Sequence, residues 1–328
     1  MNVVFIIPTG VGCAIGGHAG DATPAAKLIA SVCDKLILHP NVVNASDINE
    51  QPPNALYVEG SMLDRFLEGS IGLQEVRNNK VLVVVNPPAK PETINAVNAA
   101  RTTIGLDAHV TVLETPLTME GWIVNGVASG EATGVQELID QVSVYQFDAL
   151  AIATPIDVAN RIALDYFRGQ QSVNPWGGIE AIVSRKVSEA LNKPVAHAPV
   201  ESDDTKDDSE LFDILYKEIV HARKAPEVCS NCYIHCILKG LHKAPRVTRA
   251  GLTFKDVDAL VSPVGCIGRP HHACFEVGIP VIAVEENTTS GTFRDSRIIY
   301  VQNYWEAAGY LSCIRAGIVP RSTRSDYV

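Results

Sequence analysis

Residues 9–21 combine five glycines with a thiol, an imidazole and a carboxylate, in the order Thr-Gly-Val-Gly-Cys-Ala-Ile-Gly-Gly-His-Ala-Gly-Asp. They directly follow the apolar run 3–7 and precede a helix start at Ala22-Thr23-Pro24. Glycine lets a backbone approach a bound group closely, and the first N–H groups of a helix have no internal partners. The segment therefore predicts an anion site made by Gly10, Gly12, Gly16, Gly17 and Asp21. A tight strand-to-helix turn without a ligand is the alternative.

A second glycine segment follows an apolar run near residue 262 and repeats this pattern. Gly265 and Gly268 come first, and Arg269 and Pro270 follow, with Pro270 at a plausible first helical position. Arg269 adds a fixed positive charge and a bidentate fork that suits a carboxylate or a phosphate. We therefore expect Gly265, Gly268 and Arg269 to bind the same kind of ligand.

A third glycine segment, Asn174-Pro175-Trp176-Gly177-Gly178, precedes a predicted helix over 179–191. Its glycines mark another helix start at which backbone N–H groups can face a ligand. We expect Gly177 and Gly178 to bind the ligand, with an aromatic face nearby. A simple loop with a buried Trp176 is the alternative.

Two cysteines lie inside the first two glycine segments. Cys13 and Cys266 each follow a predicted strand, where backbone N–H groups would depress the pKa of a thiol. Two such thiols on opposite sides of a cleft would take a proton from one face of a carbon and return it on the other, as cofactor-independent racemases do. The alternative is that both are small residues that fit tight turns.

Three histidines form a second acid/base set. His18, His39 and His197 follow predicted strands, and the carboxylates of Asp21 and Glu201 lie close to two of them in sequence. Imidazole is the commonest proton-transferring side chain in enzymes, so we count these histidines as catalytic candidates. The same groups have no HExxH-like spacing, and we predict no metal site from them.

Cys229, Cys232 and Cys236 have a spacing that also occurs in metal sites. If 227–240 is one helix, Cys229 and Cys236 are about 10 Å apart along its axis. Thiolates that share one zinc ion, each about 2.3 Å from it, lie much closer together. A metal therefore requires that this segment is not a continuous helix, and that question stays open.

Short apolar runs alternate with segments of helical character along the whole chain. The runs predict strands at 3–8, 35–38, 55–58, 80–85, 109–114, 148–153, 194–198, 258–262, 280–284 and 297–302. Continuous Val, Ile and Leu runs are typical of parallel strands that helices cover on both faces. We predict an α/β protein with mostly parallel, doubly wound sheets in two Rossmann-like domains around a cleft.

A boundary between the domains is expected near residue 170, because residues 168–178 are polar and rich in glycine. This boundary gives an N-terminal α/β domain over 1–170 and a C-terminal α/β domain over 171–328. A loop within one domain is the alternative.

Polar residues gather after the predicted strands, where parallel sheets bind their ligands. The segments are His39-Pro40-Asn41-Val42-Val43-Asn44, His197-Ala198-Pro199-Val200-Glu201 and Glu285-Glu286-Asn287. In a parallel sheet these segments face one cleft. We therefore add Asn41, Asn44, Glu201, Glu285 and Asn287 to the expected ligand-binding residues.

Composition excludes several classes of protein. The chain has 328 residues, a formal net charge of −10 and 46% hydrophobic residues, which indicates a compact globular protein. Binding nucleic acid needs an excess of Lys and Arg, so no nucleic-acid partner is expected. We find no apolar stretch near the roughly 18 residues of a membrane span and no basic secretory start. The eight unevenly spaced cysteines do not suit a disulfide scaffold. We expect a cytoplasmic protein without a membrane partner, and a homo-oligomer stays open.

Several segments together carry a resemblance: Pro8-Thr9-Gly10 through Gly16-Gly17-His18-Ala19-Gly20-Asp21-Ala22, His39-Pro40-Asn41-Val42-Val43-Asn44-Ala45, Asn174-Pro175-Trp176-Gly177-Gly178-Ile179-Glu180-Ala181 and Val264-Gly265-Cys266-Ile267-Gly268-Arg269-Pro270. They resemble a family of uncharacterised proteins common in cyanobacteria, a domain of unknown function. The resemblance covers essentially the whole chain. It implies a cytoplasmic location in a photosynthetic bacterium and supplies no activity.

A more local likeness concerns nucleotide-sugar enzymes with two Rossmann-like domains, the glycosyltransferases and UDP-GlcNAc epimerases. Gly16-Gly17-His18 followed by Pro24-Ala25 is similar to their first glycine loop and helix. Their nucleotide-binding second domain is similar to Gly265 to Gly268 followed by Ala273, Glu276, Gly278, Pro280-Val281 and Glu285-Glu286-Asn287-Thr288. The pattern departs from theirs between His18 and Pro24, where this chain has additional residues.

These features predict an enzyme that binds a small anionic metabolite and works by general acid/base chemistry, with isomerisation or epimerisation favoured over hydrolysis. A non-catalytic metabolite sensor and a nucleotide-sugar-dependent glycosyltransferase-like enzyme are the alternatives. The sequence assigns no cofactor. NAD is unsupported because Gly10-Val11-Gly12 lacks a glycine three positions later.

Overall fold

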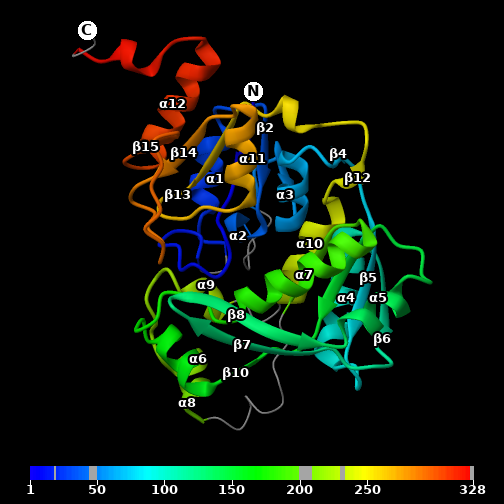
Figure 1. Ribbon diagram of the computed structural model, residues 1–328. Coiled ribbons are helices and arrows are strands. Elements are labelled where there is room, and N and C mark those ends of the chain that lie inside the picture. The colour runs from blue at the N-terminus through cyan, green and yellow to red at the C-terminus, as the bar shows by residue number, and fades with distance from the viewer. Residues whose placement is uncertain (18–19, 44–49, 199–208, 230–232, 326–328) are drawn as a thin grey trace.

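The computed structural model describes residues 1–17, 20–43, 50–198, 209–229 and 233–325 (Figure 1). It has two lobes, which we call the upper and the lower lobe after their places in Figure 1. Each lobe contains a parallel sheet that alternates with helices along the chain, so the predicted α/β class is confirmed. The predicted strands are all present, with ends that differ by a few residues.

The upper lobe is built on a six-stranded sheet in the order β15-β14-β13-β1-β2-β3. All its neighbouring strands are parallel. The strands are β1 (Asn2–Phe5), β2 (Lys35–Leu38), β3 (Ala55–Tyr57), β13 (Ala259–Pro263), β14 (Val281–Val284) and β15 (Ile298–Val301). Short runs of Val, Ile and Leu form these strands because both faces of the sheet are buried.

Helices cover both faces of this sheet. Val3 and Phe5 of β1 pack in one cluster with α1 (Thr23–Ala30) and α12 (Tyr304–Ala316). Val4, between them, points to the opposite face and packs with α3 (Gly60–Leu67) and α11 (Arg269–Val277). This alternation follows from the two-residue period of a strand. The lobe also contains α2 (Pro40–Val43) and the 3₁₀ helices η3 (Phe254–Asp256) and η4 (Pro320–Thr323).

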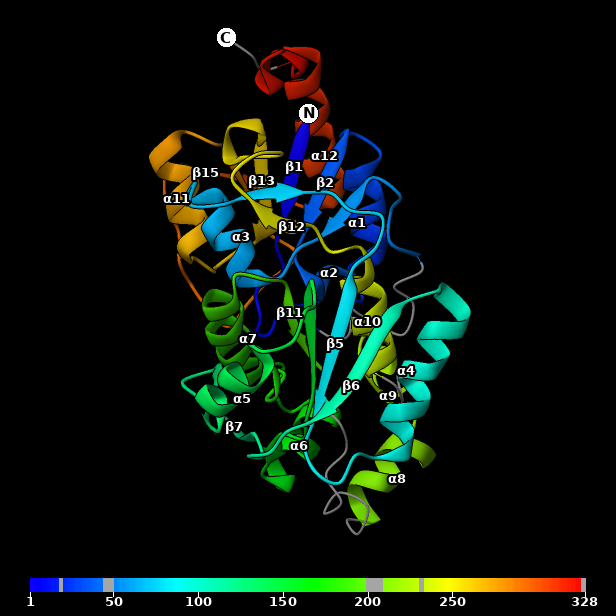
Figure 2. The ribbon, with the colours of Figure 1, turned by 90° about the vertical axis from the view of Figure 1, so that its right-hand side faces the viewer.

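The lower lobe contains a four-stranded parallel sheet in the order β11-β9-β5-β6. Its strands are β5 (Lys80–Val85), β6 (Asp107–Val112), β9 (Ala149–Ala153) and β11 (Val195–His197). The helices of this lobe are α4 (Pro91–Ile104), α5 (Val135–Val142), α6 (Asn160–Phe167), α7 (Gly177–Leu191), α8 (Ser209–Lys217), α9 (Ala225–Cys229) and α10 (Tyr233–Lys243). Figure 2 shows the sheet between α7 and α5 on one side and α4 and α10 on the other.

An antiparallel hairpin of β7 (Thr118–Val124) and β8 (Val127–Thr133) belongs to the lower lobe and was not expected from the sequence. Asn125 and Gly126 form its turn, both with positive φ, at 52° and 75°. This conformation suits the two-residue hairpin turns that match the twist of the strands. The short strand β10 (Asp157–Val158) adds to β7 in parallel.

The chain passes between the lobes at two strands that pair with each other. β4 (Gly72–Gln74) leads from α3 into β5, and β12 (Arg246–Thr248) leads from α10 back toward β13. The two strands pair antiparallel. The lower lobe is therefore inserted between β3 and β13 of the upper sheet. The sheets group the chain differently from the predicted division into 1–170 and 171–328, because strands from both ends of the chain share the upper sheet.

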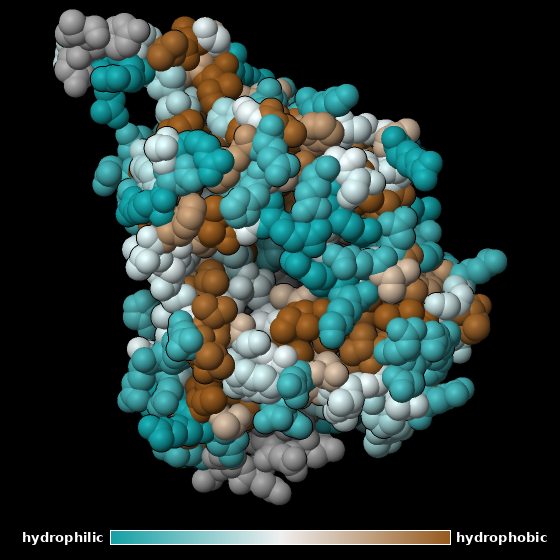
Figure 3. Space-filling model, in the orientation of Figure 1, coloured by the Kyte–Doolittle hydropathy of each residue, from teal (hydrophilic) through white to brown (hydrophobic). Residues whose placement is uncertain are grey.

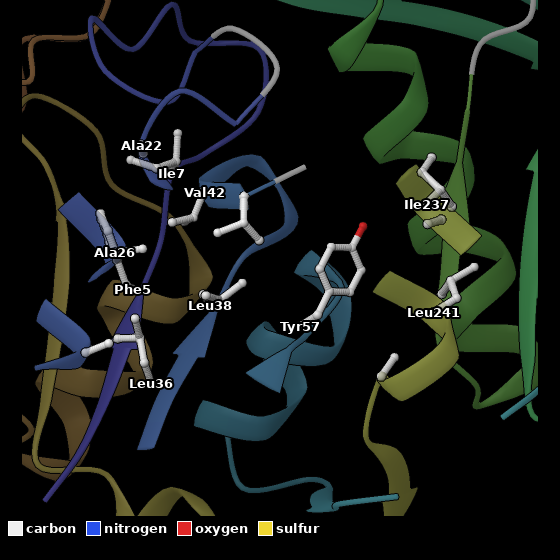
Figure 4. Close-up of a cluster of buried hydrophobic side chains, with 14 of the residues drawn as sticks. Phe5, Ile7, Ala22, Ala26, Leu36, Leu38, Val42, Tyr57, Ile237 and Leu241 are labelled. Atoms are coloured by element: carbon white, nitrogen blue, oxygen red, sulfur yellow. The ribbon is translucent and has the colours of Figure 1, made fainter. Parts of the chain in front are cut away.

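Helix α10 packs against strands of both sheets, among them β3 of the upper lobe and β9 of the lower lobe. Its Ile237 and Leu241 belong to the same buried cluster as Leu38 and Tyr57 of the upper lobe (Figure 4). The Tyr57 ring lies directly on Gly240, where an added Cβ would be 2.7 Å from the ring. One continuous hydrophobic core therefore spans the two lobes.

Gly240→Ala should destabilise the protein by about 1–2 kcal/mol, because the overlap with a buried ring outweighs the gain from removing a helical glycine. The matched control is Gly309→Ala in α12, where no atom lies within 4 Å of the added Cβ. That variant should gain about 0.5–1 kcal/mol. Urea unfolding measures both changes, and equal effects at the two glycines would contradict the contact.

Candidate functional site

The loops that follow β1 and β14 bind each other at the carboxyl edge of the upper sheet. The N–H of Ala14 donates to the carbonyl of Thr288 at 2.9 Å, and the N–H of Ser290 donates to the carbonyl of Val11 at 2.8 Å. The buried Asn287 accepts from the N–H of Ile15 at 2.8 Å. These two loops therefore lie side by side, and Asn287 holds the first loop in place.

Asp21 bonds within the first glycine loop. Its Oδ1 accepts from the N–H of Gly16 at 2.6 Å, and its Oδ2 pairs with Arg223 of the lower lobe at 2.8 Å. A carboxylate of the chain itself thus takes an N–H group that we expected to meet a ligand anion. The Asp21–Arg223 pair also links the two lobes.

The glycines of the first and third segments allow close contact between the lobes. Gly10 and Gly12 have positive φ values of 75° and 65°. The carbonyl of Gly10 accepts from the N–H of Ala128 in β8 at 2.9 Å. A Cβ on Gly177 would lie 2.7 Å from Thr9, and one on Gly178 would lie 2.3 Å from the backbone of Ala128. The first loop and the start of α7 therefore pack together, with β8 beside them.

Gly17 also has a steric role, because its added Cβ would be 2.2 Å from the carbonyl oxygen of Cys13.

The thiols of Cys13 and Cys266 do not have the depressed pKa that we expected from the sequence. Burial raises the pKa of Cys13 well above its usual value, and the nearby Cys266 and Asp21 raise it further. Burial also raises the pKa of Cys266 to about 12. Desolvation outweighs the backbone groups, so both thiols are protonated at neutral pH.

The second glycine segment satisfies its own polar groups. Gly265 has a positive φ of 83°, and an added Cβ would lie 2.3 Å from the carbonyl oxygen of Gly291. The N–H of Gly268 donates to Nδ1 of the buried His271 at 3.2 Å, and Nε2 of that histidine lies 3.0 Å from the hydroxyl of Ser262. Gly268 therefore does not offer its N–H to a ligand.

Arg269 and Glu285 are engaged in ion pairs. Arg269 pairs with Glu68, the residue after α3, at 2.7 Å and with Glu189 of α7 at 3.4 Å, so its charge links the two lobes and is engaged by carboxylates of the chain itself. Glu285 pairs with Arg294, and one of its oxygens accepts at 2.8 Å. The expectation that these two side chains are free to bind a ligand is not met.

His39 and Asn41 lie at the end of β2. Nδ1 of His39 accepts from the N–H of Asn41 at 3.2 Å, and the Asn41 amide donates to the hydroxyl of Thr9 at 2.9 Å. Desolvation lowers the pKa of His39 to about 4, so its imidazole is neutral at neutral pH. This histidine positions the start of α2 next to the first loop.

His197 stands at the carboxyl end of β11 between two oxygen-bearing side chains. Its Nε2 lies 3.1 Å from the hydroxyl of Thr154, which directly follows β9. Its Nδ1 lies 3.5 Å from Oε1 of Glu180 in the first turns of α7. The His197 side chain has no exposed surface, whereas 26% of the Glu180 side chain is exposed. An imidazole between a hydroxyl and a carboxylate can accept and return a proton.

Two tyrosines are electrostatically coupled to Glu180, the carboxylate beside this histidine. Tyr57 and Tyr233 both interact electrostatically with Glu180, and burial is the main reason that the pKa of each phenol is raised. The Tyr233 hydroxyl also donates to the backbone carbonyl of Glu227 at 2.7 Å. On the face seen in Figure 3 the surface is hollowed between the lobes, near the start of α7. We call His197, Glu180, Thr154 and Tyr57 the interlobe cluster.

Only His197 of the interlobe cluster was predicted as a site residue from the sequence. Thr154 follows a predicted strand, and Glu180 follows the glycine pair before a helix. Both therefore stand at the kinds of position, strand ends and glycine-marked helix starts, from which we selected the other site residues. Tyr57 carried none, because an aromatic residue at a strand end is more often part of the core.

Some expected site residues lie outside the described part of the chain, namely His18, Asn44 and Glu201. Of the cysteine group, Cys236 is buried in α10, and Cys232 is not described. Residues 227–229 belong to α9 and residues 233–240 belong to α10, and the residues between them lie outside the described part of the chain. Among the described residues, no group of three or more His, Cys, Asp or Glu could hold a metal ion.

Comparison with known proteins identifies a family for this chain and supplies no activity. A family described as "Protein of unknown function (DUF3326)" matches residues 2–324. An uncharacterised lipoprotein from Synechococcus sp. is 34% identical over 346 residues, which cover 98% of this chain and 92% of that protein. No solved structure matches.

The cytoplasmic location expected from the sequence is contradicted, because the Synechococcus relative is named a lipoprotein. The expectation rested on composition and on the resemblance, and neither reports directly on location. In the part of the chain that the structure describes, no helix is long and apolar enough to span a membrane.

The buried His271 predicts a loss of stability in acid. Burial lowers its pKa to about 4, whereas the unfolded value is about 6.5. The unfolded chain therefore binds the proton first, and stability falls by about 3 kcal/mol as pH decreases from 6.5 to 4. Urea unfolding across this range should show a shallower pH dependence for His271→Gln than for the wild type. His109→Gln, at an exposed site, should keep the wild-type slope, and an unchanged slope in His271→Gln would contradict the assignment.

Proposed function

We propose that this chain, which belongs to the DUF3326 family of proteins of unknown function, is an enzyme. It isomerises or epimerises a small anionic metabolite by general acid/base chemistry. The metabolite binds between the lobes, and His197 carries the proton. The observation that carries this proposal is the buried imidazole of His197 between Thr154 and Glu180.

The surroundings of His197 suit proton transfer. The Glu180 carboxylate lies beside Nδ1, which has no hydrogen-bond partner among the described residues, and would stabilise the imidazolium that forms when Nδ1 accepts a proton from the substrate. Thr154 holds Nε2 at 3.1 Å and fixes the ring plane.

The strand order supports a ligand crevice at this edge of the molecule. The upper sheet has the order of a doubly wound Rossmann-like sheet, and its direction of winding reverses between β1 and β13. Ligands of such sheets bind outside the carboxyl ends at this switch point. We propose that the two lobes are Rossmann-like units around this cleft. The positive end of the α7 dipole lies beside Thr9 and suits an anionic group of the ligand.

A second candidate function is metabolite binding without catalysis. The paired crossover strands β4 and β12 favour it, because two short connections between lobes are a natural place for a small rotation on ligand binding. The core shared through α10 limits that rotation, so we prefer the enzyme.

Proton exchange in D₂O tests the proposed enzyme across several substrate classes at once. The wild type is incubated with hydroxy acids, sugar phosphates and simple carboxylates, and ¹H NMR records the loss of carbon-bound protons. We expect exchange with one of these classes, and a reduction of about 10²- to 10⁴-fold in His197→Gln. Glu180→Gln should also slow the exchange, and its partly exposed side chain makes it the variant less prone to misfolding.

His109→Gln is the control, since this exposed histidine lies in β6 of the lower sheet. Exchange in none of the classes, or full exchange in His197→Gln, would refute the proposal. Ligand-dependent melting temperatures without any exchange would favour the binding protein.

A further inference from the structure

Two buried polar atoms from opposite lobes lack a hydrogen-bond partner among the described residues. They are the hydroxyl of Tyr57 in β3 and Nδ1 of His197 in β11. Tyr57 is 2% exposed as a whole residue, and the His197 side chain has no exposed surface. A buried donor or acceptor without a partner costs about 1–3 kcal/mol, so native proteins rarely keep one without a reason.

Ala196 and Ala198, the residues on either side of His197, belong to the same buried cluster as Tyr57. Nδ1 of His197 is 3.5 Å from a Glu180 oxygen, in a geometry that does not form a hydrogen bond. Glu180 also acts electrostatically on the Tyr57 hydroxyl. Helix α10 packs against both β3 and β11, the strands that carry Tyr57 and His197. In Figure 4 the Tyr57 hydroxyl lies between Val42 on one side and Ile237 on the other.

The hydrogen-bonding capacity of these groups selects one kind of ligand group. The Tyr57 phenol keeps its proton and donates, and the Glu180 carboxylate accepts. A carboxylate or phosphate placed here would meet the charge of Glu180 at short range. The neighbouring Glu59 side chain, which accepts from the N–H of Ser61 at 2.8 Å, is also a carboxylate and would not attract an anionic group. An alcohol both accepts and donates, so it satisfies the two sides together.

We infer that a hydroxyl group of the substrate binds between Tyr57, Glu180 and His197, so that the substrate is a hydroxylated metabolite such as a hydroxy acid. This inference deepens the proposed function and rests on it for the occupant being a substrate. The hydroxyl accepts from Tyr57 and donates to Glu180. It places the carbon that bears it beside the imidazole that carries the proton.

Matched ligand pairs test the inference through binding alone. The pairs are glycolate and acetate, lactate and propionate, and malate and succinate, which differ by one hydroxyl. In thermal-shift titrations of the wild type, the hydroxy acid of at least one pair should raise the melting temperature more than its partner does. Tyr57→Phe should bind that hydroxy acid about tenfold more weakly and should lose the difference within the pair.

Tyr300→Phe is the matched control. Tyr300 belongs to β15, at the opposite edge of the upper sheet from β3, and its hydroxyl accepts from the N–H of Asp295 at 2.8 Å. It should keep the difference between the ligands. Tyr57→Phe removes a hydroxyl without a described partner, so its melting temperature without ligand should stay near that of the wild type.

Equal shifts within every pair for the wild type would overturn the inference, because the place would then hold water or nothing. A difference that persists in Tyr57→Phe would overturn it as well. The proposed function fails on a different result, namely the absence of exchange of carbon-bound protons in D₂O. The two tests are independent, because hydroxyl-selective binding is measured without any turnover.

Discussion

The contact between the Tyr57 ring and Gly240 is the packing constraint on which both lobes depend. Only a residue without a side chain allows the ring to lie on α10, and α10 also packs against the lower sheet. The lobes thereby share one hydrophobic core. The Arg269–Glu189 ion pair between the lobes adds little to this contact, because both side chains are 41% exposed. The position of the Tyr57 hydroxyl relative to His197 is therefore fixed by apolar packing.

Glycine-rich loops have two physical uses that a single sequence does not separate. One is to expose N–H groups to a ligand, and the other is to let backbones pack closely with positive φ. In this protein the second use dominates in the parts described. Gly16 donates to Asp21, Gly268 donates to His271, and Gly10 accepts a bond from β8. The loops build the edge that carries the cleft, and side chains of the interlobe cluster provide the chemistry.

The parallel strands could be predicted because each is a continuous apolar run, which is the direct result of burial on both faces. The β7–β8 hairpin was missed although Asn125-Gly126 is a strong turn signal, since its strands are half exposed and mix Thr, Glu and Ser with Ala and Val. Which strands share a sheet depends on pairing between distant residues, and local patterns carry no information about it. For the same reason His197 could be selected as a strand-end histidine, whereas Tyr57 becomes interesting only through a neighbour on another lobe. The raised pKa of Cys13 also required knowledge of burial.

The insertion of the lower lobe between β3 and β13 has a consequence for synthesis on the ribosome. Val3 of β1 pairs with Ala259 of β13, so the central strand of the upper sheet emerges long before its neighbour is made. The lower lobe, whose strands and helices are contiguous in the chain, is complete first. Its closing helix α10 then presents an apolar face against which β3 can settle while the remaining strands are translated. The order of translation thus lets the lower lobe form first and provide a surface on which the upper lobe, whose segments flank it in the chain, completes its sheet.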